Sequence, residues 1–211
     1  MKFIIVLFGA PGCGKGHLWG MLQEQLLKLV PEDELSYIST GNLIREEINK
    51  KSDLGCQIAE LVQKGKLVPD SIVDNLVTNA LSEKQSIKVL DGYPRTNAQF
   101  DALKAQIDDD TEVIAVFRDT PVDIILGRIA KRRVCKNCKH THTSDDLCCP
   151  KCGGESLIRK DDAAIEARLE EFRKNTLPIW KRMSEIGISI HCIGDPASED
   201  IAYLLMHFMF D

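Results

Sequence analysis

The residues best suited to chemistry form a glycine-rich segment near the N-terminus that ends in a lysine. Residues 9–16 read G-A-P-G-C-G-K-G and match the pattern G-x-x-x-x-G-K. Glycines allow successive backbone N–H groups to converge on phosphate oxygens, and a following helix N-terminus adds a favourable dipole. A glycine-rich hairpin turn would explain the glycines but not Lys15, whose charge suits a phosphoryl group. The segment therefore predicts a phosphate-binding loop.

The residues after the lysine indicate how a magnesium ion beside the phosphates would be held. The common pattern continues with Ser or Thr, whose hydroxyl binds the metal, but this chain has Gly16 and His17. Phosphates and water must then hold most of the magnesium. Asp91 follows the apolar run 87–90, where a parallel sheet presents polar groups, and could orient those waters. The other interpretation of Asp91 is an N-cap for the next segment.

Two C-x-x-C pairs, with ten residues between them, have the spacing of a zinc ribbon. The predicted ligands are Cys135, Cys138, Cys149 and Cys152. Four thiolates close the coordination shell, so the Zn²⁺ would be structural, and a short segment with few apolar side chains needs such a device to fold. Two reduced pairs or a redox dithiol are the alternative, and Cys148, His140 or His142 could replace one ligand.

The elements that must position these groups alternate between apolar runs and segments with helical spacing. Strands are expected at residues 2–8, 35–39, 87–90, 113–117 and 188–191. After the glycine-rich loop, apolar residues recur at helical spacing from Leu18 to Leu29, and Pro31 closes the helix. This alternation predicts an α/β fold with a parallel sheet wrapped by helices. Residues 40–68 have helical spacing without a strand, which favours a helical flap.

Length and composition limit the organisation to one ordinary domain with a small appended module. The chain has 211 residues, of which 44% are hydrophobic and 28% are charged. A net charge of −5 gives no overall attraction to nucleic acid. The apolar run at the N-terminus is too short for a signal peptide or a membrane span. We therefore expect a cytoplasmic monomer without membrane or nucleic-acid partners.

Several further motifs follow one another along the chain. The segments are Y-I-S-T-G-N-L-I-R at 37–45, G-K-L-V-P-D at 65–70, L-D-G-Y-P-R-T-x-x-Q at 90–99, R-x-x-x-R-R at 128–133, R-x-D-D at 159–162, R-L at 168–169 and T-x-P at 176–178. Together with the loop at 9–16, they make the chain resemble the adenylate kinases, a family of nucleoside monophosphate kinases. The resemblance covers nearly the whole chain.

The resemblance implies a fold, a reaction and a division of the chain. The fold would be a P-loop NTPase-type parallel five-stranded sheet, and the reaction a reversible Mg²⁺-dependent transfer of a phosphoryl group from ATP to AMP that gives two ADP. Residues 1–211 would form a single kinase domain. Its core would comprise residues 1–38, 69–132 and 160–211, with a monophosphate-binding flap at 39–68 and a zinc-binding lid at 133–159 that closes over ATP.

The resemblance also implies roles for individual residues. ATP would be contacted by Gly12, Cys13, Gly14, Lys15, Gly16, His17, Arg128 and Arg132. AMP would be contacted by Thr40, Gly41, Arg45, Val68, Gly92, Arg95, Gln99, Arg159 and Arg168. The catalytic groups would be Lys15, Asp91, Arg95, Arg132, Arg159 and Arg168. Planar arginine forks suit such a site, because two polyanions must be brought together and neutralised.

Departures from the family pattern and alternative functions also follow from the residues. His17 replaces a Thr, Asn42 an Asp and Lys131 a Gly, and the segment between Asp162 and Arg168 is shortened. Thr40 and Thr96 favour AMP, but an acceptor such as GMP, UMP or CMP is the alternative. A less favoured alternative is a zinc-ribbon module that binds ATP as a ligand and contacts nucleic acid through the basic flank of the lid.

Overall fold

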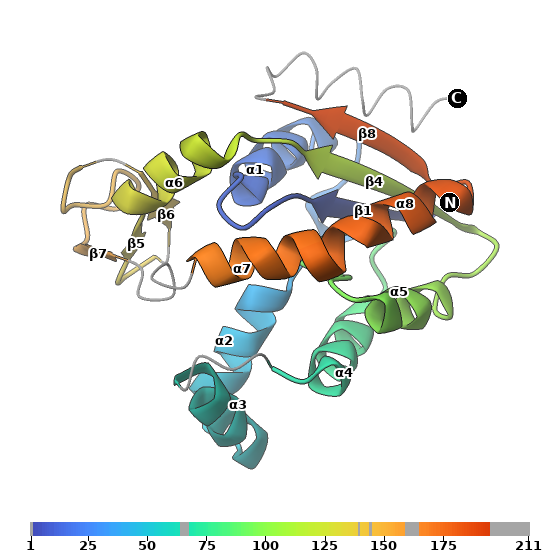
Figure 1. Ribbon diagram of the computed structural model, residues 1–211, viewed down its shortest axis with the longest axis horizontal. Coiled ribbons are helices and arrows are strands. Elements are labelled where there is room, and N and C mark those ends of the chain that lie inside the picture. Colours follow the sequence, from blue (N-terminus) through green and yellow to red (C-terminus); the bar gives the residue numbers. More distant parts are fainter. Residues whose placement is uncertain (1, 64–67, 139, 144, 159–164, 195–211) are drawn as a thin grey trace.

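A five-stranded parallel sheet with the order β2-β3-β1-β4-β8 forms the centre of the protein (Figure 1). The computed structural model describes residues 2–63, 68–138, 140–143, 145–158 and 165–194. The strands of the sheet are β1 Lys2–Phe8, β2 Leu35–Ser39, β3 Ile87–Asp91, β4 Thr111–Arg118 and β8 Ser189–Ile193. The predicted α/β class and its parallel sheet are therefore confirmed.

Some of the helices cover the two faces of this sheet, and others project beyond it (Figure 1). The helices are α1 Lys15–Leu26, α2 Thr40–Lys50, α3 Asp53–Gln63, α4 Asp70–Leu81, α5 Asn97–Lys104, α6 Val122–Lys131, α7 Ile165–Glu171 and α8 Leu177–Glu185. A 3₁₀ turn occupies Glu32–Glu34, and a π-helical turn, Phe172–Thr176, joins α7 to α8. In Figure 1, α7, this turn and α8 form one long helix along the sheet.

The central strand β1 is buried on both faces, because its side chains alternate between two hydrophobic clusters. Phe3, Ile5 and Leu7 pack in one cluster with the apolar side of α1. Ile4 and Val6 pack in the other, with residues of α4, α5 and α8. This double burial explains why residues 2–8 read as an almost continuous apolar run. Because β1 is the central strand in the order, its end and the loop after it lie at the middle of the sheet.

Most strand predictions match to within a few residues. The main differences are that β3 includes Asp91, that β4 spans Thr111–Arg118, and that β8 runs to Ile193. The first helix is shorter than predicted, since α1 ends at Leu26 and Leu29 lies in the turn that follows, where its side chain is exposed. Apolar spacing alone did not reveal this end.

Two parts project from the core. Helices α2 and α3 extend to one side, as expected for a helical flap, and a small three-stranded antiparallel sheet lies beyond the end of α6 (Figure 1). The small sheet consists of β5 Arg133–Cys135, β6 Thr141–His142 and β7 Ser156–Ile158. The end of the predicted flap at 64–67 and the end of the predicted lid at Arg159 lie outside the described residues. Among the described helices, none is both long and apolar enough to span a membrane.

Candidate active site

The glycine-rich loop connects the central strand β1 to helix α1. Gly14 is the N-cap of α1 and has a left-handed φ of 100°, a conformation that favours glycine. The N–H groups of His17 and Leu18 donate to the carbonyl of Gly14 at 3.0 Å, so the helix begins within the loop. The first N–H groups of a helix lack intrahelical acceptors and attract anions. The predicted strand, loop and helix are confirmed.

Lys15 lies across this loop. Its Nζ donates to the carbonyl of Gly9 at 2.8 Å and to that of Ala10 at 3.3 Å. The side chain is only partly exposed, so the ammonium group is held among the loop's backbone atoms rather than extended into solvent. His17, the residue in place of the usual Thr, is exposed on the first turn of α1.

Asp91 lies beside the loop, at the carboxyl edge of the sheet. It ends β3, where it pairs in register with Leu7 of β1 and with Ser39 of β2. The N-cap of α5 is Thr96, which accepts a hydrogen bond from the N–H of Gln99, so capping of that helix does not explain Asp91. The Asp91 carboxylate therefore does not cap α5 and lies near the phosphate loop.

Tyr37, which the sequence analysis did not single out, holds the Asp91 carboxylate. Its hydroxyl donates to Asp91 Oδ2 at 2.6 Å, and its ring stacks on Trp19 with centroids 4.7 Å apart. Burial raises the pKa of Tyr37 above its ordinary value, and the charge of Asp91 raises it further. The hydroxyl therefore remains a proton donor and restricts the orientation of the carboxylate. Sequence offered no signal for this contact, because 54 residues separate the two partners.

On the sequence-based prediction that Asp91 orients magnesium-bound water, replacing Tyr37 with Phe should raise the magnesium concentration needed for half-maximal activity by roughly tenfold, as loss of an outer contact to a metal site typically does. Tyr93→Phe is the matched control, because the Tyr93 hydroxyl donates to Asp74 at 2.8 Å and not to Asp91. A magnesium titration of initial rates checks the prediction. An unchanged magnesium requirement in Tyr37→Phe would contradict it.

On the other side of Asp91, three of the predicted acceptor residues contact one another. Arg95 Nε donates to the carbonyl of Gly92 at 2.7 Å, and its NH2 group donates to Thr40 Oγ1 at 3.2 Å. A Cβ at Gly92 would lie 2.7 Å from Thr40 Oγ1 and 2.8 Å from Arg95 NH2, so this close packing requires glycine. The Arg95 side chain is exposed. Together these residues place a guanidinium at the carboxyl edge of β3.

Gly41 lies in the first turn of α2, and Arg45 lies about one turn further along the helix. The Arg45 guanidinium packs over Gly41, where a Cβ would come within 3.3 Å of its NH1 atom. Its NH2 group donates to Asn42 Oδ1 at 2.6 Å. Asn42, the residue that departs from the family pattern, therefore orients this arginine.

Gln99 is buried and its side-chain amide is engaged at both ends. Its Nε2 donates to Asp70 at 2.8 Å, and its Oε1 accepts from the N–H of Arg95 at 2.7 Å. Asp70 also accepts from the hydroxyl of Thr96 at 2.7 Å. This network fixes the turn that carries Arg95. The two bonds use one N–H of Nε2 and one lone pair of Oε1, so a second donor and a second acceptor position remain for the base edge that the resemblance implies.

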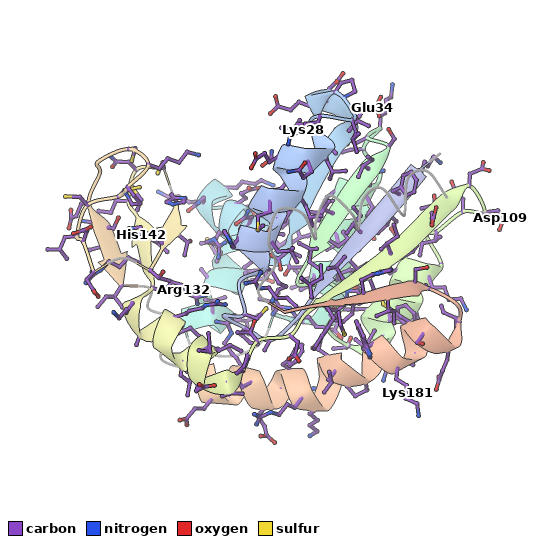
Figure 2. The ribbon with its side chains drawn as sticks, turned by 90° about the horizontal axis from the view of Figure 1, so that it is seen from above. Lys28, Glu34, Asp109, Arg132, His142 and Lys181 are labelled. Carbon is purple, nitrogen blue, oxygen red and sulfur yellow. The ribbon has the colours of Figure 1, made fainter. Side chains whose placement is uncertain are left out.

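The remaining predicted residues are distributed around this edge. Arg128 donates from NH1 to the carbonyl of Cys13 at 3.1 Å, whereas Arg132 caps the C-terminus of α6 where the lid begins (Figure 2). Val68 packs against the cluster of α4 and α5, and Arg168 is half-buried on α7. Arg159 lies outside the described residues.

The small antiparallel sheet and its loops, which form the predicted lid, bring together the predicted metal ligands. The sulfur atoms of Cys135, Cys138, Cys149 and Cys152 all lie within 4.8 Å of one another, and three of the pairs are 3.4, 3.5 and 3.6 Å apart. Tetrahedral Zn–S bonds of about 2.3 Å put sulfur atoms roughly 3.8 Å apart, so the four thiols fit this ion. The N–H of Cys138 lowers the pKa of Cys135, which favours its thiolate form, whereas the neighbouring cysteine sulfurs raise the pKa of Cys138.

The alternative ligands occupy other positions. His142 is buried with its Nε2 2.9 Å from Ser156 Oγ, and Cys148 is exposed in a β-bridge with Glu155. His140 stacks on His142 at a centroid distance of 6.2 Å. Within the described part of the lid, the possible metal-binding group is the predicted set of four cysteines.

A phosphate loop after the central strand of a parallel sheet, with an acidic residue ending the neighbouring strand, defines a P-loop nucleotide-binding protein. The family model described as adenylate kinase matches residues 7–188 of the chain. The chain is 35% identical to an adenylate kinase of Methanosarcina acetivorans, over 97% of the chain and 99% of the relative. An adenylate kinase of Mycoplasmopsis pulmonis is 34% identical, over 93% of each chain. The chain belongs to the adenylate kinase family, a group of nucleoside monophosphate kinases and therefore of phosphotransferases.

Proposed function

We propose that the protein catalyses the reversible, Mg²⁺-dependent transfer of the terminal phosphoryl group of ATP to AMP, giving two ADP. The observation that carries this proposal is the shared edge of the sheet. The phosphate loop follows β1, and the contacts between Thr40, Gly92 and Arg95 surround the end of the adjacent strand β3. Two phosphate-binding groups on neighbouring strands suit a reaction that brings two polyanions together.

The donor nucleotide would be held on the loop side. We assign its phosphates to the backbone of Gly12, Cys13, Gly14 and Gly16 and to the ammonium of Lys15, with His17 on the first turn of the helix. Arg128 would lie beside the base, and Arg132 would approach the phosphates from the lid. The left-handed Gly14 and the position of Lys15 within the loop support these roles.

The acceptor would be held on the flap side. We assign Thr40, Gly41, Val68, Gly92 and Gln99 to the AMP subsite, with Arg45, Arg95, Arg159 and Arg168 around its phosphate and the transferring group. Support comes from the Arg95 contacts and from Thr176, whose hydroxyl donates to the carbonyl of Arg95 at 3.0 Å and so ties the helix of Arg168 to this turn. Arg159 is assigned to this subsite on its sequence motif alone.

Asp91 is proposed to act on magnesium through water. When bound with ATP, Mg²⁺ supplies positive charge that neutralises the phosphates. The Asp91 carboxylate, oriented by Tyr37, would accept hydrogen bonds from the ion's water molecules. The arginines and Lys15 would align the two nucleotides and stabilise the charge that develops during transfer.

The division of the chain is proposed to serve the same reaction. The core 1–38, 69–132 and 160–211 would carry the loop, the flap 39–68 would bind AMP, and the lid 133–159, with structural Zn²⁺, would close over ATP. Closure excludes water and so favours transfer over hydrolysis, which is the role that lids have in adenylate kinases. We further propose that the protein acts as a monomer in the cytoplasm, a reducing compartment that preserves zinc-binding thiolates.

The acceptor preference is tested by supplying ATP and magnesium with AMP, GMP, UMP or CMP at equal concentration. ADP formation with AMP should exceed that with each other acceptor by at least about tenfold, because a site that hydrogen-bonds one base edge leaves polar groups unpaired with another. A higher rate with another monophosphate would contradict the assignment of AMP.

A further inference from the structure

Arg118 is buried beneath the phosphate loop. It is the last residue of β4, its side chain is 2% exposed, and it is among the largest fully buried side chains in the described part of the protein. The residues before it on β4 are largely apolar. Burial of a guanidinium is costly unless its hydrogen bonds are satisfied, so an arginine at this position calls for a specific partner.

The partner in the loop is the carbonyl of Cys13. Arg118 Nε donates to this oxygen at 2.7 Å, and the same oxygen accepts from Thr120 Oγ1 at 3.2 Å and from Arg128 NH1 at 3.1 Å. The Arg118 bond is short and charge-assisted, which makes it the strongest of the three. A single carbonyl in the loop is thus held by three donors, from the end of β4, from the segment after it and from α6.

Holding this carbonyl also orients the next N–H group. In a trans peptide the C=O of Cys13 and the N–H of Gly14 point in opposite directions. Since the C=O points toward Arg118, the N–H of Gly14 points away from the guanidinium. The guanidinium also packs against Gly14, where a Cβ would lie 3.2 Å from Arg118 Nε and 3.4 Å from its Cζ.

We infer that Arg118 is a positioning residue for the triphosphate of ATP: through the carbonyl of Cys13 it aims the N–H of Gly14 at a phosphate oxygen, and its buried charge makes the loop more favourable for an anion. This inference rests on the proposed function, because it takes the loop as the site of ATP. It adds two residues, Arg118 and Thr120, that contact the loop from below and do not touch the nucleotide.

Three substitutions separate this role from simple support of the fold. Arg118→Met removes the charge and the donor, and Arg118→Lys keeps the charge without the planar fork. Thr120→Val removes a weaker donor to the same oxygen with little change of shape. Arg182→Met is the matched control, because Arg182 pairs with Asp101 at 2.7 Å on the surface of the core.

Inorganic tripolyphosphate serves as a probe of the loop that needs no base and no acceptor. Its dissociation constant and the KM for ATP should rise about tenfold to a hundredfold in Arg118→Met, the usual cost of removing a charged contact from a buried network. Arg118→Lys should recover part of this loss, and Thr120→Val should raise both values about twofold to fivefold, as expected for one neutral hydrogen bond. The KM for AMP should stay within about twofold in all of them, because AMP does not use this loop.

The inference is overturned if Thr120→Val and Arg118→Lys bind tripolyphosphate as tightly as the unchanged protein, or if the KM values for ATP and AMP rise together. If Arg118→Met does not fold, the measurements on Thr120→Val and Arg118→Lys decide whether the inference holds. A protein that binds tripolyphosphate but transfers no phosphoryl group to AMP would refute the proposed function and leave the effect of Arg118 measurable.

Discussion

Replacing Lys15 with Met is expected to lower the kcat for ADP formation about a thousandfold, since such a loss is typical when a preorganised charge on a transferring group is removed. Lys15 is held within the loop by the carbonyls of Gly9 and Ala10, so its charge is already placed before a nucleotide binds. Methionine has a similar length and no charge. The fold should persist, because the side chain is not part of the hydrophobic clusters.

A matched control for this change exists near the same helix. Lys28 lies just beyond the far end of α1, is exposed, and donates to Gln25 at 3.0 Å. Lys28→Met should keep the kcat within about twofold, as substitutions of exposed surface groups usually do. Initial rates and thermal unfolding of both variants check the prediction. If Lys15→Met retained a tenth of the activity, the role given to Lys15 would be wrong.

The proposed zinc site predicts that removal of the ion unfolds the lid while leaving the core intact. The buried side chains in the described part of the lid are Cys135, Cys149, His142 and Ser156, whereas Leu147, Leu157 and Ile158 are exposed. The described residues of the lid thus include no fully buried aliphatic side chain, and structural zinc in comparable small units contributes roughly 10–16 kcal/mol of binding free energy. Without the ion, we expect rapid tryptic cleavage between residues 133 and 158 and retained helical signal from the core.

Two cysteine variants show which sulfurs hold the ion. Cys152→Ser removes a member of the cluster, while Cys148→Ser changes the exposed neighbour of Cys149. Metal analysis should give one zinc per chain for the unchanged protein and for Cys148→Ser, and a large loss for Cys152→Ser. Loss of zinc in Cys148→Ser, with retention in Cys152→Ser, would contradict the proposed ligand set.

The features that sequence predicted well depend on local pattern. The run 2–8, the loop ending in Lys15 and the two C-x-x-C pairs are each specified by neighbouring residues, and the structure forms the expected strand, turn and sulfur cluster. Asp91 was located because the end of a parallel strand is a recognisable place in a sheet.

The features that sequence missed depend on contacts between distant residues. Tyr37 reaches Asp91 across adjacent strands, and Arg118 reaches Cys13 over 105 residues. Tyr37 opens the quoted segment 37–45, but nothing in that segment indicates a contact with Asp91, and Arg118 lies outside every quoted motif. An arginine that ends a largely apolar strand was the available signal for Arg118, and its partner depends on the packing of β4 beside β1.

Supplying ADP and magnesium as the only substrates tests the central claim most directly. The account predicts that ATP and AMP appear in equal amounts, that the reaction stops at equilibrium, and that Lys15→Met slows it severely. Formation of AMP and phosphate without ATP, or no change in ADP at all, would contradict the claim that this protein transfers a phosphoryl group between adenine nucleotides.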